Sequence, residues 1–109
     1  MSELNINVQS HKHVDVIKLS GRVDSSNASE FDDVLKEQLE KGRSKLVLEL
    51  SQVTYMSSAA LRAMVSARRG GGDVRIAAPS DRVTEVLELA GLQSVFQVYD
   101  DTLSAVGDF

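Results

Sequence analysis

Two adjacent serines, Ser57 and Ser58, have the clearest capacity for chemistry in this sequence, because they follow an apolar run at residues 46–50 and precede a segment with helical periodicity. A helix that begins there places unpaired backbone N–H groups and the positive end of its dipole beside both hydroxyls. In α/β folds, ligand and partner sites commonly lie at the carboxyl ends of buried strands. From the residues alone, a helix N-cap is the simpler interpretation, and a functional site is the alternative.

The other candidates for chemistry do not form a catalytic, metal-binding or phosphate-binding motif. His11 and His13 are the only histidines, and although they could share one strand face, their spacing supplies no third metal ligand. The sequence has no cysteine, which removes thiolate nucleophiles and sulfur-based zinc sites. The glycines at 70–72 follow a predicted helix, whereas a phosphate-binding loop opens one, so we interpret them as a helix stop. We therefore expect no enzymatic activity, no metal and no cofactor.

The hydrophobic pattern predicts an α/β fold that positions the serine pair. Alternating apolar residues at 4–8, followed after a polar stretch by the apolar-rich residues 14–19, predict an initial β-hairpin. Helical spacing then begins at Asn27, which forms a capping-box-like start with Glu30, and residues 46–50 are typical of a central strand covered on both faces. We expect a mixed sheet of about four to five strands with about four helices. The remaining predicted elements are a helix from Ser57 or Ser58, a strand at 74–78, a helix capped at 79–81, a strand at 95–99 and a short helix from about Asp101.

Length and composition restrict the class of protein. A chain of 109 residues with 42% hydrophobic content is the size of one domain, so we expect a single domain over residues 1–109. The net charge of −4, with both signs interspersed, argues against a nucleic-acid partner. No apolar segment is long enough to span a membrane and the N-terminus does not resemble a signal peptide, so we expect a cytoplasmic protein. We also expect a monomer. The carboxylates of the first predicted helix form a solvated face or part of a partner surface.

Three further stretches carry a resemblance that covers residues from about 4 to 105. Residues 21–28 resemble the Gly-x-aliphatic-Asp-x-x-Asn-Ala pattern that leads into the first helix of the STAS family of bacterial anti-sigma-factor antagonists. Residues 46–56 resemble the central strand of that family and the turn that follows it, and residues 87–92 with 95–96 resemble its late helix and last strand. The resemblance implies a STAS-like single domain with its core at about 4–105.

In family antagonists the central strand is followed by Asp-Ser-x-Gly-Leu, and the serine is phosphorylated by an anti-sigma factor that is also an ATP-dependent kinase. This alignment assigns the phosphorylated position to Ser58, with Ser57 as the alternative acceptor. Ser57 then stands in place of the family aspartate and Ala60 in place of the glycine, while Leu61 matches. The resemblance implies a partner-binding surface made of Asp24, Ser25, Ser26, Asn27, Met56, Ser57, Ser58, Ala59, Ala60 and Arg62.

Two functions follow from the resemblance. In the first, the unphosphorylated chain binds an anti-sigma factor and serine kinase of the ATP-binding, histidine-kinase-like fold and thereby releases a sigma factor, and phosphorylation ends that binding. A phosphatase is then a further partner. In the second, the departures at Ser57 and Ala60 indicate a module that is not phosphorylated and that serves as an adaptor on a transporter ATPase or a signalling scaffold.

Overall fold

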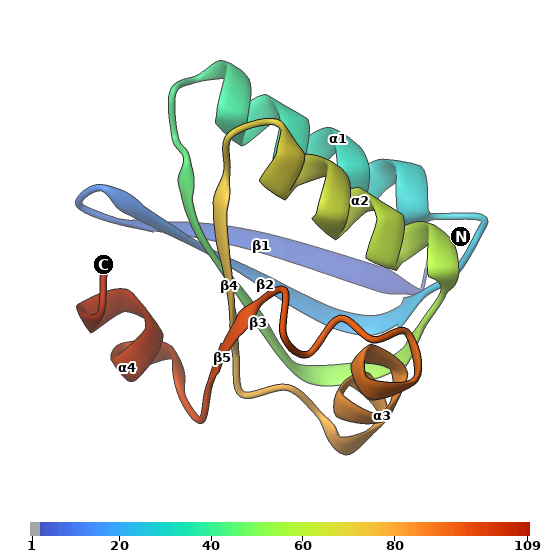
Figure 1. The fold of residues 1–109 in the computed structure, drawn as a ribbon. Coiled ribbons are helices and arrows are strands. Elements are labelled where there is room, and N and C mark those ends of the chain that lie inside the picture. Colours follow the sequence, from blue (N-terminus) through green and yellow to red (C-terminus); the bar gives the residue numbers. More distant parts are fainter. Residues whose placement is uncertain (1–2) are drawn as a thin grey trace.

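The computed structural model describes residues 3–109 and shows helices packed on both faces of a five-stranded sheet (Figure 1). The predicted domain limits of 1–109 include residues 1 and 2, which lie outside this description. In chain order the elements are β1 (Leu4–His11), β2 (Val14–Val23), α1 (Ala28–Glu40), β3 (Lys45–Met56), α2 (Ser58–Arg69), β4 (Asp73–Ala77), α3 (Asp81–Leu89), β5 (Gln97–Tyr99) and α4 (Thr102–Gly107).

The strands lie in the order β1-β2-β3-β4-β5. β1 and β2 form the predicted antiparallel hairpin, and all other neighbouring pairs are parallel. The predicted α/β class and mixed sheet are therefore confirmed. Several strand boundaries differ from prediction. β1 and β2 continue past residues 8 and 19, to His11 and Val23, β3 continues past residue 50 to Met56, and the last strand is confined to Gln97–Tyr99.

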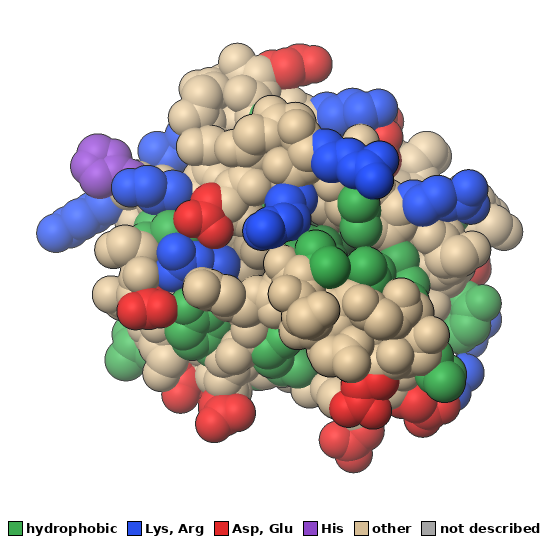
Figure 2. All heavy atoms as spheres, in the orientation of Figure 1, with side chains coloured by type: hydrophobic (Ala, Val, Ile, Leu, Met, Phe, Trp, Pro, Cys, Tyr) green, Lys and Arg blue, Asp and Glu red, His purple; other side chains and the backbone are tan. Residues whose placement is uncertain are grey.

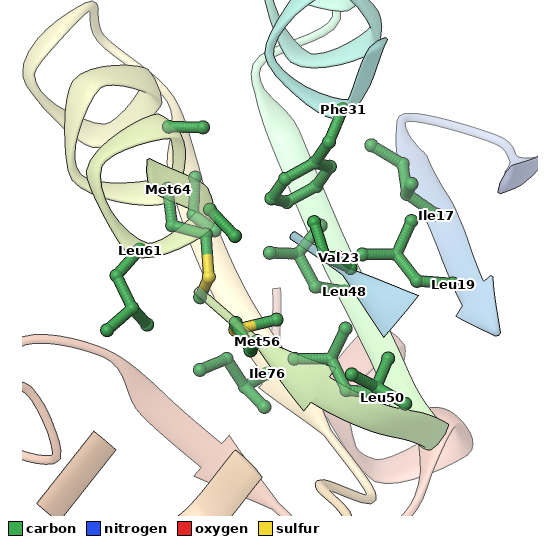
Figure 3. Packing of buried hydrophobic residues seen from close by; sticks show 14 of the residues in the cluster. Ile17, Leu19, Val23, Phe31, Leu48, Leu50, Met56, Leu61, Met64 and Ile76 are labelled. Carbon is green, nitrogen blue, oxygen red and sulfur yellow. The ribbon is translucent and has the colours of Figure 1, made fainter. Parts of the chain in front are cut away.

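The alternating side chains of the strands divide the core into two layers. Ile17, Leu48 and Ile76 face α1, α2 and α3, where they pack against helix side chains such as Phe31 and Met64 (Figure 3). On the other face, a smaller cluster that includes Val16, Val47, Ala77 and Ala105 packs beneath α4. Residues 46–50 of β3 are all buried, because both faces of this strand are covered. No helix in residues 3–109 combines the length and the apolar character needed to cross a bilayer.

A buried polar cluster lies at the end of the sheet where β2 begins. The Asp15 side chain is fully buried and accepts hydrogen bonds from Arg43 at 2.7 and 2.9 Å, from Ser10 at 2.7 Å and from Gln38 at 2.5 Å. The hydrogen bonds from Arg43 are the largest cause that lowers the pKa of Asp15 to about 2. This cluster joins the hairpin to α1 and to the loop after it.

Gly21 lies on β2, where it pairs with Leu4 of β1 on one side and adjoins a shift in the β2–β3 register on the other. Its φ of +97° is unfavourable for residues with a side chain, and a Cβ atom here would lie 1.9 Å from the backbone oxygen of Glu3. The β2–β3 register shifts between Gly21 and Arg22. Glycine is therefore required for β1 to approach β2 near the carboxyl ends of β2 and β3, which lead into residues 24–27 and into Ser57 and Ser58.

Candidate functional site

The two loops that sequence analysis singled out lie side by side at the carboxyl edge of the sheet. β2 and β3 are parallel and end together, with Val23 paired to Met56. The backbone N–H of Ser57 donates to the carbonyl of Val23 at 2.8 Å, which ties the start of α2 to the end of β2. Residues 24–27 follow β2 directly, so the parallel register brings both predicted parts of the site to one place.

Ser57 faces inward and forms the N-cap of α2. The residue is only 9% exposed, and its Oγ accepts a hydrogen bond from the backbone N–H of Ala60 at 3.3 Å. Its carbonyl accepts from the N–H of Leu61 at 3.1 Å. The Ser57 hydroxyl thus satisfies one of the four backbone donors that the start of a helix leaves without an intrahelical partner, and the Ser57 carbonyl accepts the first intrahelical hydrogen bond.

Ser58 has the opposite environment. It is the first residue of α2 and is exposed to solvent. Ala60, two residues after Ser58, is fully buried within the helix and has an ordinary backbone conformation without a positive φ. The helix therefore accommodates alanine where the resembling pattern has glycine, and the methyl group of Ala60 packs in the core instead of obstructing the outer surface.

The loop after β2 is held by its own polar side chains. Asp24 accepts hydrogen bonds from the backbone N–H and the hydroxyl of Ser26, at 3.0 and 2.6 Å, and the hydroxyl contact is the main cause that lowers the pKa of Asp24. Asn27 is 3% exposed, accepts from the N–H of Asp24 at 2.9 Å and donates to the carbonyl of Arg22 at 2.9 Å.

These contacts correct the prediction of a capping box at the start of α1. Asn27 occupies the N-cap position but makes no side-chain cap hydrogen bond to the helix. Its amide instead bonds backward, to Arg22 and Asp24, because these backbone groups leave the sheet beside it. The residue that the sequence pattern assigned to helix initiation therefore shapes the loop.

Burial divides the predicted site residues into two groups. Asn27, Met56, Ser57 and Ala60 are buried and position the surface from within. The exposed and partly exposed group, which a partner can touch, consists of Asp24, Ser25, Ser26, Ser58, Ala59 and Arg62. Within residues 3–109, no three His, Asp or Glu side chains come together in a way that could hold a metal ion.

Arg62 lies between two hollows on the outer surface of α2. The first, of about 330 Å³, separates α1 from α2 and is lined in part by Ser25, Asp32 and Ala59. The second, of about 560 Å³, lies between α2 and residues 90–92. Figure 2 shows hydrophobic side chains gathered beside α2 in this second region, with Lys and Arg side chains along the helix. Both hollows include Arg62 in their lining.

Several residues of these hollows were absent from the predicted site. Val65, Ser66 and Arg69 line the second hollow together with Ser58 and Arg62. A helical signal for them exists, since their separations from Ser58 are 7, 8 and 11 residues and place them on one helix face. Leu92 completes the hollow from a different segment and has no such signal, because only the tertiary fold brings it to α2.

Comparison with known proteins assigns the family. Residues 5–105 match the model of the STAS domain family, and the chain belongs to this family. BtrV of Bordetella bronchiseptica, which is named as an anti-sigma factor antagonist, is 33% identical over 95 residues, a match that covers 84% of this chain and 82% of BtrV.

Solved structures share the fold. The crystal structure of a Thermotoga maritima protein classed as an anti-sigma factor antagonist superposes with a TM-score of 0.87 at 26% identity, over 94% of this chain and 92% of that one. SpoIIAA, also an anti-sigma factor antagonist, has the same fold at lower identity. Its unphosphorylated form gives a TM-score of 0.81 at 15% identity, over 94% of this chain and 93% of that one. The phosphorylated form from Bacillus gives 0.74 at 14% identity, over 95% and 98%.

Proposed function

We propose that this chain is an anti-sigma factor antagonist that binds its anti-sigma factor when Ser58 is unmodified and releases it when Ser58 is phosphorylated. The proposed partner is a serine kinase with an ATP-binding, histidine-kinase-like fold, and a phosphatase restores the binding state. Membership of the STAS family and the names of the relatives support the class of partner. The proposed unit is one cytoplasmic domain, spanning 1–109, that acts as a monomer.

The difference in exposure between the two serines is the observation that carries this proposal. Ser58 is exposed at the first position of α2, whereas the Ser57 hydroxyl is buried and engaged as the cap. A kinase must reach the hydroxyl that it phosphorylates, and adding phosphate to Ser57 would remove the cap and force a charged group into a buried position. The geometry therefore favours Ser58, the same residue that the family pattern selects.

The location of Ser58 also explains how phosphorylation can alter binding with little effect on the fold. A phosphate adds about −1.5 to −2 charges, which the positive end of the α2 dipole tolerates in the free protein. Within an interface the same charge would have to lose its water and would repel acidic groups of the partner. A change of several kcal/mol between the two states is enough to convert mostly bound into mostly free.

The test is phosphorylation by the cognate kinase with ATP, followed by peptide mass spectrometry. We expect one phosphate on Ser58 of the parent chain and none in the Ser58→Ala variant. In a folded Ser57→Ala variant, Ser58 should be phosphorylated to the same extent as in the parent. Far-UV circular dichroism of each variant verifies that it is folded. A known antagonist serves as the positive control for kinase activity. Phosphorylation of Ser57 alone would refute the switch. So would the absence of phosphate from both serines under conditions in which the same kinase fully phosphorylates the control.

A second candidate is an adaptor module that is never phosphorylated. Ser57 in place of the family aspartate is the observation that favours it, because the carboxylate beside the acceptor is absent. In this case the same surface binds a transporter ATPase or a signalling scaffold constitutively. Binding of the unmodified chain to such a partner, with no reaction at Ser58, would select the adaptor over the switch.

A further inference from the structure

Arg62 is an unpaired cation one helical turn from the proposed phosphorylation site. It is exposed, and in residues 3–109 it forms neither an ion pair nor a side-chain hydrogen bond. Asp32 lines the same hollow as Arg62, but its carboxylate is paired with Lys36 at 2.7 Å. The Arg62 guanidinium is thus available to a new anion.

The spacing of Ser58 and Arg62 directs the two side chains toward each other. Residues four apart on a helix have Cβ atoms about 5–6 Å apart. Side chains on a helix point back toward its N-terminus, so that of Arg62 extends over the turn that contains Ser58. Both residues line the hollow between α2 and residues 90–92. An anion that precedes a cation by four residues is also the favourable order relative to the helix dipole.

The other arginines near this edge are less suited to the role. Arg22 lies 3.7 Å from the carboxylate of Glu3, and its guanidinium stacks over the ring of Tyr55 at 4.5 Å. Arg69 lines the same hollow as Ser58, but eleven residues of helix separate them by roughly 16 Å along the axis. Arg62 is therefore the cation on α2 that a phosphate on Ser58 can reach.

We propose that the guanidinium of Arg62 binds the Ser58 phosphate of its own chain. Phosphorylation then both adds a negative charge to the partner-binding surface and withdraws a positive charge from it. Before phosphorylation, Arg62 is free to pair with an acidic group of the anti-sigma factor. After phosphorylation, its planar guanidinium bonds the phosphate oxygens of its own chain. This inference rests on the proposed phosphorylation of Ser58 and specifies how that modification weakens binding to the partner.

The test uses the full chain with phosphoserine encoded at position 58, and it follows the phosphate by ³¹P NMR as a function of pH. A phosphoserine has a second pKa of about 6, and a cation in contact with the phosphate lowers it. We expect Arg62→Gln to raise this measured pKa by roughly half a unit. Arg62→Lys should retain most of the effect, because it keeps the charge. Arg69→Gln is the matched control on the same helix face and should leave the titration unchanged.

The salt dependence of this pKa provides a second test of the contact between Arg62 and the phosphate. At 1 M NaCl the Debye length falls to about 3 Å, so the difference between the parent and Arg62→Gln should shrink. Equal titration curves for the parent and Arg62→Gln, or an equal shift in Arg69→Gln, would overturn the role of Arg62. Because the phosphoserine is encoded, no kinase takes part. Failure of a kinase to modify Ser58 would refute the proposed function and, with it, the part of Arg62 in the switch, even if the encoded phosphate contacts Arg62. An unchanged titration would refute the role of Arg62 and leave the proposed function standing.

Discussion

Replacement of Ser57 by alanine separates the structural serine from the exposed one. The Ser57 Oγ accepts the N–H of Ala60, and Ala60 has no exposed surface through which water could replace that bond easily. Ser57→Ala therefore leaves a helix donor unsatisfied. The corresponding change at Ser58 removes an exposed hydroxyl that makes no hydrogen bond in residues 3–109.

The magnitude follows from the geometry of the cap. Loss of a serine N-cap costs about 0.5–2 kcal/mol. The oxygen–nitrogen distance of 3.3 Å is long for such a bond and argues for a smaller value, whereas the burial of Ala60 argues for a larger one. We expect Ser57→Ala to lower the free energy of unfolding by about 1 kcal/mol, equivalent to about 4–8 °C in Tm. Ser58→Ala should stay within about 0.5 kcal/mol of the parent.

Urea unfolding followed by far-UV circular dichroism measures both variants under the same conditions. Ser57→Asp is a third variant that retains an N-cap acceptor. Its carboxylate can accept the hydrogen bond from the Ala60 N–H at the positive end of the helix dipole, and these two gains should offset the cost of placing a charge at this buried position, so it should stay close to the parent stability. The reasoning would be refuted if Ser58→Ala destabilised the chain as much as Ser57→Ala. It would also be refuted if Ser57→Asp lost as much stability as Ser57→Ala, because the cap would then not explain the loss.

Two further predictions concern the edges of the sheet. The lowered pKa of Asp15 corresponds to about 2 kcal/mol of stability, which is complete above the ordinary pKa of 3.8 and is lost as the pH falls toward 2. Arg43 is the largest of the causes that lower this pKa, so we expect Arg43→Gln to lose most of this stability at pH 7 and progressively less below pH 4 in urea unfolding. The surface control Lys41→Gln should change stability by less than about 0.5 kcal/mol at either pH. Gly21→Ala combines a positive φ with a distance of 1.9 Å between the added Cβ and the Glu3 backbone oxygen, and it should lower the free energy of unfolding by at least about 2 kcal/mol. Gly42→Ala has a φ of +78° but no atom within 4 Å of the added Cβ, and it should lower that free energy by about 1 kcal/mol. Equal losses in the two glycine variants, or a pH-independent loss in Arg43→Gln, would contradict these assignments.

Periodic segments of the sequence were sufficient to predict most of the fold. The hairpin followed from the alternation at residues 4–8 and the apolar residues at 14–19, and the burial of residues 46–50 on both faces followed from their nearly continuous apolar run. The start of α2 was predicted to within one residue, because Ser57 and Ser58 are both good cap residues. Sequence alone did not distinguish which serine caps the helix, since that depends on the hydrogen bond between Ser57 and the end of β2.

The parts that sequence could not predict depend on contacts between distant segments. Asn27 has the composition of a helix cap, but the neighbouring backbone of Arg22 and Asp24 competes for its amide and prevails. Leu92 joins the hollow beside α2 only because α3 folds back toward that helix. The buried Asp15 is likewise invisible to a hydrophobic pattern, since its burial requires the facing Arg43.

The charge of the first part of α2 gives the proposed switch a definite sign. Residues 57–62 carry a single charge, that of Arg62, because Ser57 stands where the family pattern has an aspartate. A phosphate on Ser58 would change the net charge of this segment from +1 to about −1. In a chain with aspartate at the first position and no arginine at the last, the same modification would only make a negative segment more negative. On the proposed mechanism, the part of the partner that faces residues 57–62 is therefore acidic, and phosphorylation converts attraction at that part into repulsion.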